Sequence, residues 1–171
     1  MRRLSRDRRG TSAIEFAIAL PVLILLFTGG FQLSDAVSAY RKVTTTSRAL
    51  ADLTSQYVVV DDATLDKILA ASTQVMAPYS TTDAKLVISQ INTDSTYQTK
   101  VVWSRGRNAT ALRVGDPVTI PTAMKVRDTY AIIARVTYTY RPVFGNSYVG
   151  TIPMGDTIIM LPRASESIEK K

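Results

Sequence analysis

Cysteine and histidine are both missing from this chain of 171 residues. Their absence excludes zinc fingers, thiol chemistry and histidine-dependent catalysis. The sequence also lacks a phosphate-binding loop, a nucleophile elbow and paired catalytic carboxylates. We therefore expect a protein that is not an enzyme and that binds no cofactor and no metal.

Charge is almost missing from one long stretch near the N-terminus. Between Thr11 and Ser34 the only charged residue is Glu15. The apolar run 16–31, with apolar neighbours at both ends, approaches the roughly 20 residues that cross a bilayer as a helix. It contains Pro21, which membrane helices tolerate because neighbouring groups satisfy the freed carbonyl. A single membrane-spanning helix is expected here.

Two adjacent small residues, Gly29 and Gly30, lie near the end of this run. Glycines in a membrane helix let a neighbouring helix approach closely. Together with Pro21 they are the residues that we expect to shape helix packing.

Positive charge is concentrated ahead of the apolar run. The chain carries a net charge of +7, and residues 1–10, with five arginines and one aspartate, contribute +4 of it. A basic cluster directly before an apolar helix keeps the N-terminus in the cytoplasm. The remainder of the chain is then expected outside the cytoplasm. Since the high pI is largely a property of this leader, it does not indicate a nucleic-acid partner.

Glu15 distinguishes three interpretations of the segment. A carboxylate in an apolar helix costs about 2.5–3.5 kcal/mol at the bilayer centre and less near the interface. In a cleaved secretory signal, with Val37-Ser38-Ala39 as the cleavage site and Tyr40 as the new N-terminus, or in a plain signal anchor, a neutral residue would serve better. In the third interpretation, a prepilin-like processing motif, the carboxylate of Glu15 has a partner.

Gly10-Thr-Ser-Ala-Ile-Glu15-Phe16 resembles the type IV prepilin processing motif, a glycine followed at the fifth position by glutamate and then by an aromatic residue. The resemblance implies that a prepilin peptidase cuts after Gly10, so that Thr11 becomes the N-terminus. The new α-amine is cationic and lies on the same helical face as Glu15, four residues away. Glu15, with Phe16, is thereby expected to govern assembly and the register between subunits.

The wider segment, 9–26, resembles the TadE/TadG-like family of tight-adherence (Flp-type) pilus assembly proteins. Glu-Phe-Ala at 15–17 precedes an aliphatic stretch broken by Pro21, and a Ser/Ala/Thr-rich stretch follows over 34–54. The chain length favours the TadE-like branch. The resemblance implies a structural pseudopilin or minor pilin in pilus biogenesis.

The expected partners are a prepilin peptidase, other pilin-like subunits, inner-membrane pilus assembly proteins and membrane lipid. The expected location is the bacterial inner membrane, crossed once, with the C-terminal domain in the periplasm. The alternative is a signal-anchored extracytoplasmic binding domain with no pilus role.

Helical spacing of apolar residues continues past the membrane, and no glycine or proline interrupts 31–54. One helix from Ser12 to about Ser55 is expected, with the apolar positions Phe31, Leu33, Val37, Tyr40, Val43, Leu50 and Leu53. A short extended piece at 58–60 and a second helix should follow, the latter from Ala63 to about Met76, capped by Asp62 and stopped by Pro78.

Alternation of period two predicts strands at 85–90, 97–103, 129–141 and 157–161. In the second strand one face should carry Tyr97, Thr99, Val101 and Trp103. A basic loop is expected at 105–110, and Gly155-Asp156 should precede the last strand. In the 129–141 strand the tyrosines Tyr138 and Tyr140 lie opposite the arginines, which favours core residues over an aromatic and basic binding platform.

The fold class is therefore α+β, a long transmembrane helix that continues into a periplasmic domain with an antiparallel sheet of about four strands packed against helix. The expected organisation is a leader at 1–10 cleaved after Gly10, the long helix at 11–56, an extracytoplasmic domain at 57–162 and a flexible tail at 163–171.

Overall fold

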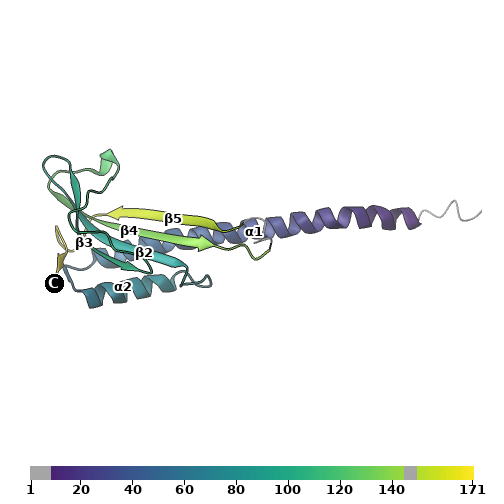
Figure 1. The fold of residues 1–171 in the computed structure, drawn as a ribbon, viewed down its shortest axis with the longest axis horizontal. Helices are drawn as coiled ribbons and strands as arrows, with labels where there is room; N and C mark the ends of the chain where they lie inside the picture. Colours follow the sequence, from purple (N-terminus) through teal and green to yellow (C-terminus); the bar gives the residue numbers. More distant parts are fainter. Residues whose placement is uncertain (1–8, 145–149) are drawn as a thin grey trace, which may run out of the picture.

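The structure, a computed structural model, describes residues 9–144 and 150–171. Its first element is α1 (Arg9–Ser55), a single helix of 47 residues. The N-terminal half of α1 projects away from the remainder of the molecule, and the C-terminal half lies along a sheet (Figure 1). The expected long helix is confirmed and begins three residues earlier. Most of the expected leader, residues 1–8, lies outside the described residues.

The sheet is antiparallel and has the strand order β3-β2-β4-β5. Its strands are β2 (Ala84–Thr93), β3 (Thr99–Arg107), β4 (Thr129–Tyr140) and β5 (Ile152–Met160). The second helix, α2 (Asp62–Gln74), packs beside α1, next to β3, while α1 lies on β4 and β5. The expected α+β fold, with a four-stranded antiparallel sheet packed against helix, is confirmed.

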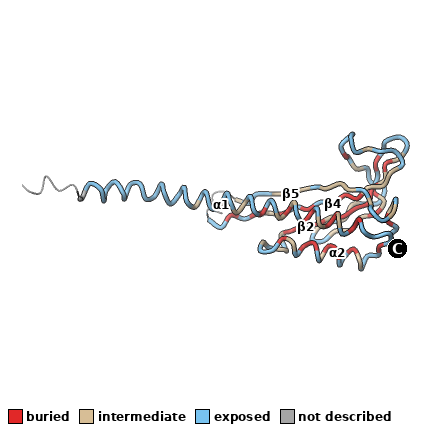
Figure 2. Tube along the Cα trace, turned by 180° about the vertical axis from the view of Figure 1, so that it is seen from behind, coloured by how far each residue is buried: buried red, intermediate tan, exposed pale blue. Residues whose placement is uncertain are grey.

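The main core lies between the helices and one face of the sheet. On α1 it is formed largely by small side chains, which let the helix lie close to the strands. Figure 2 shows burial along this half of α1 and exposure along the projecting half. The fully buried positions of α1 are Ala39, Val43, Thr46, Ser47, Leu50, Ala51, Thr54 and Ser55. Of the apolar positions expected from helical spacing, only Val43 and Leu50 are buried.

A smaller core lies on the opposite face of the sheet. Ile91, Val101 and Ile133 pack there with Ile120, which belongs to the long connection 108–128. This connection contains the short 3-10 helix η2 (Thr122–Met124) and covers the distal part of that face, the end farthest from the projecting helix (Figure 1).

A register shift opposite Gln90 and Ile91 corrects the expected pattern of β3. Trp103 pairs with Gln90 and Val101 pairs with Ile91, so Val102 is the extra residue of a β-bulge. Trp103 therefore faces the main core and Val101 the smaller one. The prediction that they share a face was wrong, because the bulge reverses the alternation.

The expected basic loop at 105–110 is also corrected, since β3 continues to Arg107. Arg105 binds Asp66 of α2 with two hydrogen bonds of 2.8 and 2.7 Å and lies 3.5 Å from Asp62. Asp62 is not the cap of α2. The side chain of Asp61 accepts the hydrogen bond from the Thr64 N–H at 2.7 Å, so the helix begins one residue earlier than expected.

The C-terminal segment differs most from the sequence-based expectation. We expected a flexible tail at 163–171, yet this segment is packed against the domain. Its strand β6 (Glu169–Lys170) pairs in parallel with β1 (Val59–Val60). Ile168 is buried in the main core, and its carbonyl accepts a hydrogen bond of 3.0 Å from the indole of Trp103.

Two further strand boundaries are corrected. β5 begins at Ile152, so Gly155 and Asp156 lie inside the strand instead of ahead of it. The carboxylate of Asp156 accepts a hydrogen bond of 2.6 Å from Ser47 and so joins β5 to α1. β2 continues to Thr93, three residues past its expected end.

Candidate functional site

The projecting half of α1 is the first candidate site. Within it an apolar stretch is long enough to cross a membrane, and none of that stretch is buried inside the molecule. At 1.5 Å per residue, the 21 residues from Thr11 to Phe31 measure about 30 Å, the thickness of a bilayer's hydrocarbon core. This apolar N-terminal helix indicates a membrane anchor.

Glu15 lies on this exposed helix among apolar neighbours. A shallow depression on the helix surface is lined by Glu15 with Ile18, Ala19, Val22 and Leu23. The carboxylate is therefore presented on an apolar face and not on a polar one. It lies one helical turn after Thr11, as expected from the spacing of these residues.

The other predicted residues of the site lie on the same helix. Gly10 and Thr11 lie in the first turn of α1, which begins at Arg9. Pro21 lies inside α1, where its missing N–H leaves one carbonyl of the preceding turn without its helical partner. A Cβ placed on Gly29 or Gly30 would meet no atom within 4 Å, so this surface is open to a neighbour.

Residues 10–52 match the family model described as TadE-like protein. This segment is similar to TadE-like proteins. The match covers about a quarter of the chain and runs from the predicted processing glycine to Asp52, three residues before the end of α1. The match to this model indicates a role in tight-adherence pilus assembly. No curated protein and no solved structure matches the chain.

The TadE-like segment carries an apolar stripe beyond the membrane-spanning length. Leu33, Val37 and Tyr40 are exposed and follow one another at helical spacing. They continue the apolar surface that includes Gly30, which lies three residues before Leu33. The exposed apolar surface of α1 thus extends alongside the folded domain.

A carboxylate and two phenols fix α1 to the sheet immediately after the membrane-spanning length. The hydroxyl of Tyr140 donates to Oδ2 of Asp35 at 2.6 Å, and the hydroxyl of Tyr79 donates to Oδ1 of Asp35 at 2.9 Å. Burial, assisted by the hydrogen bond to Asp35, raises the pKa of Tyr79 to about 12. The same causes raise the pKa of Tyr140. Both phenols are therefore protonated donors at neutral pH.

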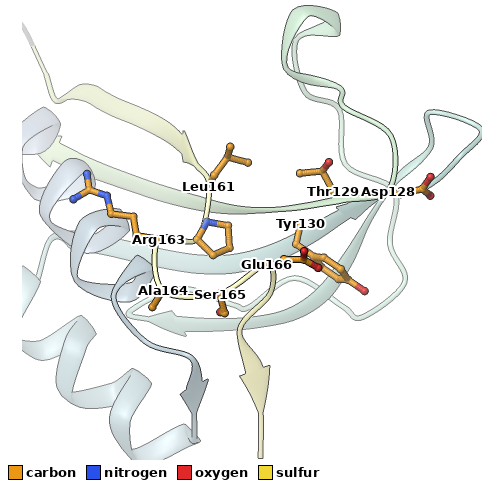
Figure 3. A pocket seen from close by; sticks show the side chains of 9 residues that line it. Asp128, Thr129, Tyr130, Leu161, Arg163, Ala164, Ser165 and Glu166 are labelled. Carbon is orange, nitrogen blue, oxygen red and sulfur yellow. The ribbon is translucent and has the colours of Figure 1, made fainter.

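A groove of about 620 Å³ lies at the distal end of the domain, between the start of β4 and the segment 161–166. Figure 3 shows the side chains that line it. One of them, Arg163, forms an ion pair of 2.7 Å with Asp52 of α1. The nine lining residues contain no pairing of a nucleophile with a base, so they suggest no catalytic chemistry.

The cluster of Asp35, Tyr79 and Tyr140 was not predicted from the sequence. The alternation of residues in 129–141 places Tyr140 in the core but offers no partner for its hydroxyl, because Asp35 lies 105 residues away. Asp61 and Asp62 serve the helix cap and the Arg105 ion pair, respectively. Among the described residues no group of three or more acidic side chains is arranged as a metal site.

Proposed function

We propose that this chain is a pseudopilin or minor pilin of a tight-adherence (Flp-type) pilus system. In this proposal a prepilin peptidase cuts after Gly10 on the cytoplasmic side of the inner membrane. Residues 11–31 span the membrane, and the sheet domain stands in the periplasm. Its function is to assemble with other pilin-like subunits during pilus biogenesis, initiation or stabilisation.

The observation that carries the proposal is the lone carboxylate of Glu15 on an exposed apolar helix. A buried unpaired carboxylate is costly in lipid, so a partner is needed. Cleavage after Gly10 creates one, since the free α-amine of Thr11 carries a positive charge one turn away. The shortened helix also brings Glu15 close to its own N-terminus, where the helix dipole favours negative charge.

The same amine can be supplied by a neighbouring subunit. If the Glu15 of one subunit pairs with the Thr11 amine of the next, the ion pair sets the axial register between two helices. Gly29, Gly30 and the stripe of Leu33, Val37 and Tyr40 provide the surface on which such a helix packs.

Ordinary signal cleavage fits the chain less well. The alternative cleavage site, Val37-Ser38-Ala39, lies in the middle of α1, and Ala39 is fully buried against the domain. Cleavage there would remove helix residues that hold the fold, Asp35 among them. A retained helix is therefore favoured over a cleaved secretory signal.

The test is N-terminal sequencing of the mature protein from cells that contain a prepilin peptidase. The proposal predicts a mature chain that begins at Thr11, and an uncleaved precursor for Gly10→Ala. Glu15→Gln, which keeps the size of the side chain, should be cleaved normally but should fail to support piliation. An uncleaved parent chain, or one that starts at Tyr40, would favour the anchored or secreted binding domain instead.

A further inference from the structure

The chain that follows β4 lies beside α1 at the base of the domain (Figure 1). It includes Phe144, whose backbone binds the side-chain amide of Gln32. The Gln32 Nε2 donates to the Phe144 carbonyl, and the Phe144 N–H donates to Gln32 Oε1 at 3.3 Å. The side-chain amide of Gln32 thus pairs with both the N–H and the carbonyl of Phe144.

An aromatic contact accompanies these hydrogen bonds. The rings of Phe31 and Phe144 meet edge to face, with centroids 6.5 Å apart. Neither ring is buried by this contact, since Phe31 remains 52% exposed and Phe144 53% exposed. The neighbouring Val143 is 66% exposed. Among the described residues, Phe31, Val143 and Phe144 thus bring exposed apolar side chains from two distant parts of the chain to the base of the domain.

The position of this cluster along α1 indicates what covers it. Phe31 ends the length of about 30 Å that matches the hydrocarbon core. Exposed Phe and Leu side chains of segments that lie at a membrane surface insert about 5–10 Å into the boundary between headgroups and acyl chains. A domain anchored by α1 brings Phe144 to the same height as Phe31, because Gln32 holds the two together.

We propose that Val143 and Phe144 insert into the outer interface of the bilayer beside Phe31. The domain then has a second point of contact with lipid, which limits its tilt and its rotation about α1. This inference rests on the proposed membrane span of residues 11–31. It adds a lipid-contacting residue pair from the middle of the chain, which the apolar helix alone does not imply.

Quenching of tryptophan fluorescence by brominated lipid tests the proposal. The full chain is reconstituted in phosphatidylcholine vesicles whose acyl chains carry bromine either near the headgroup or near the methyl end. Three single variants are compared, Phe144→Trp, Phe31→Trp and Val126→Trp. The emission of the parent, from Trp103 buried in the core, is subtracted from each.

Val126 is the matched control, because it is 58% exposed and precedes β4 at the opposite end of that strand. The 12 residues of β4 place the two ends about 36 Å apart. We expect shallow bromine to quench Phe144→Trp about as strongly as Phe31→Trp, deep bromine to quench both less, and Val126→Trp to be unaffected. Val143→Trp should repeat the result for Phe144→Trp.

The outcomes separate this inference from the proposed function. Quenching of Phe31→Trp without quenching of Phe144→Trp or Val143→Trp would overturn the inference and leave the membrane span intact. A blue-shifted but unquenched Phe144→Trp would also overturn it, since a protein neighbour would then cover the site. If Phe31→Trp itself escapes quenching, the membrane span fails and the inference fails with it.

Discussion

The hydroxyl of Tyr140 donates a hydrogen bond of 2.6 Å to Oδ2 of Asp35, and so joins the last residue of β4 to α1. Asp35 follows the proposed membrane span by only four residues. The direction in which the anchored helix leaves the domain is therefore fixed by a carboxylate that two tyrosines share.

Replacing this carboxylate should destabilise the domain. Asp35→Ala leaves the phenols of Tyr79 and Tyr140 without their acceptor, and Tyr140 is buried, so a loss of roughly 1–3 kcal/mol is expected. Urea unfolding of the full chain in detergent, followed by the fluorescence of Trp103, measures it. Glu166→Ala, at an exposed carboxylate, is the control. Equal unfolding midpoints for the two variants would contradict the role of the cluster.

The same tyrosines predict how stability depends on alkaline pH. Their pKa values are raised in the folded state, that of Tyr79 from 10.0 to about 12. The unfolded chain therefore loses these protons first, and the stabilisation, complete below pH 10, declines as the pH rises toward 12. The urea midpoint should fall over this window. Tyr79→Phe should make the fall shallower, and an unchanged slope would show that Tyr79 does not contribute.

The C-terminal segment should be needed for stability. Ile168 is buried in the main core, so Ile168→Ala removes packed methylene groups and should cost about 2–5 kcal/mol. Glu169→Ala changes the adjacent exposed residue and should have little effect. Urea unfolding of both variants distinguishes a packed segment from a flexible tail, for which the two substitutions would be equally harmless.

Helix packing in the membrane can be tested separately from folding. Since a Cβ at Gly30 meets no atom within 4 Å, Gly30→Leu should leave the urea midpoint unchanged. In the assembled state the larger side chain should separate the helices, so crosslinking to other pilin-like subunits and surface piliation should both decrease. Gly30→Ala should cause a smaller decrease. Full piliation of Gly30→Leu would exclude this glycine from the packing surface.

Elements with strong local patterns were predictable from the sequence. The apolar run and the uninterrupted helical spacing predicted α1, and the alternation at 129–141 predicted β4 with Tyr138 and Tyr140 in the core. Features that depend on residues far apart in the sequence could not be predicted in this way. The bulge at Val102 has no local signal, and the order of the C-terminal segment depends on the contact of Ile168 with Trp103, 65 residues away.

The residues of the candidate site also fall into those that could be predicted from the sequence and those that could not. Glu15, Gly29 and Gly30 could be selected because a charge or a gap in side-chain volume is visible within an apolar run. The contact between Gln32 and Phe144 could not, since 112 residues separate its partners. Hydrogen bonds to a backbone also place no demand on the identity of Phe144.

The continuity of α1 has a mechanical consequence. Because the segment 32–55 that underlies the sheet is the same helix as the proposed membrane span, no loop separates that span from the domain. Any axial displacement or rotation of the membrane half, such as extraction of the subunit from the bilayer, is transmitted directly to the sheet. In the proposed orientation, the C-terminal end of α1 stands about 36 Å above the membrane surface.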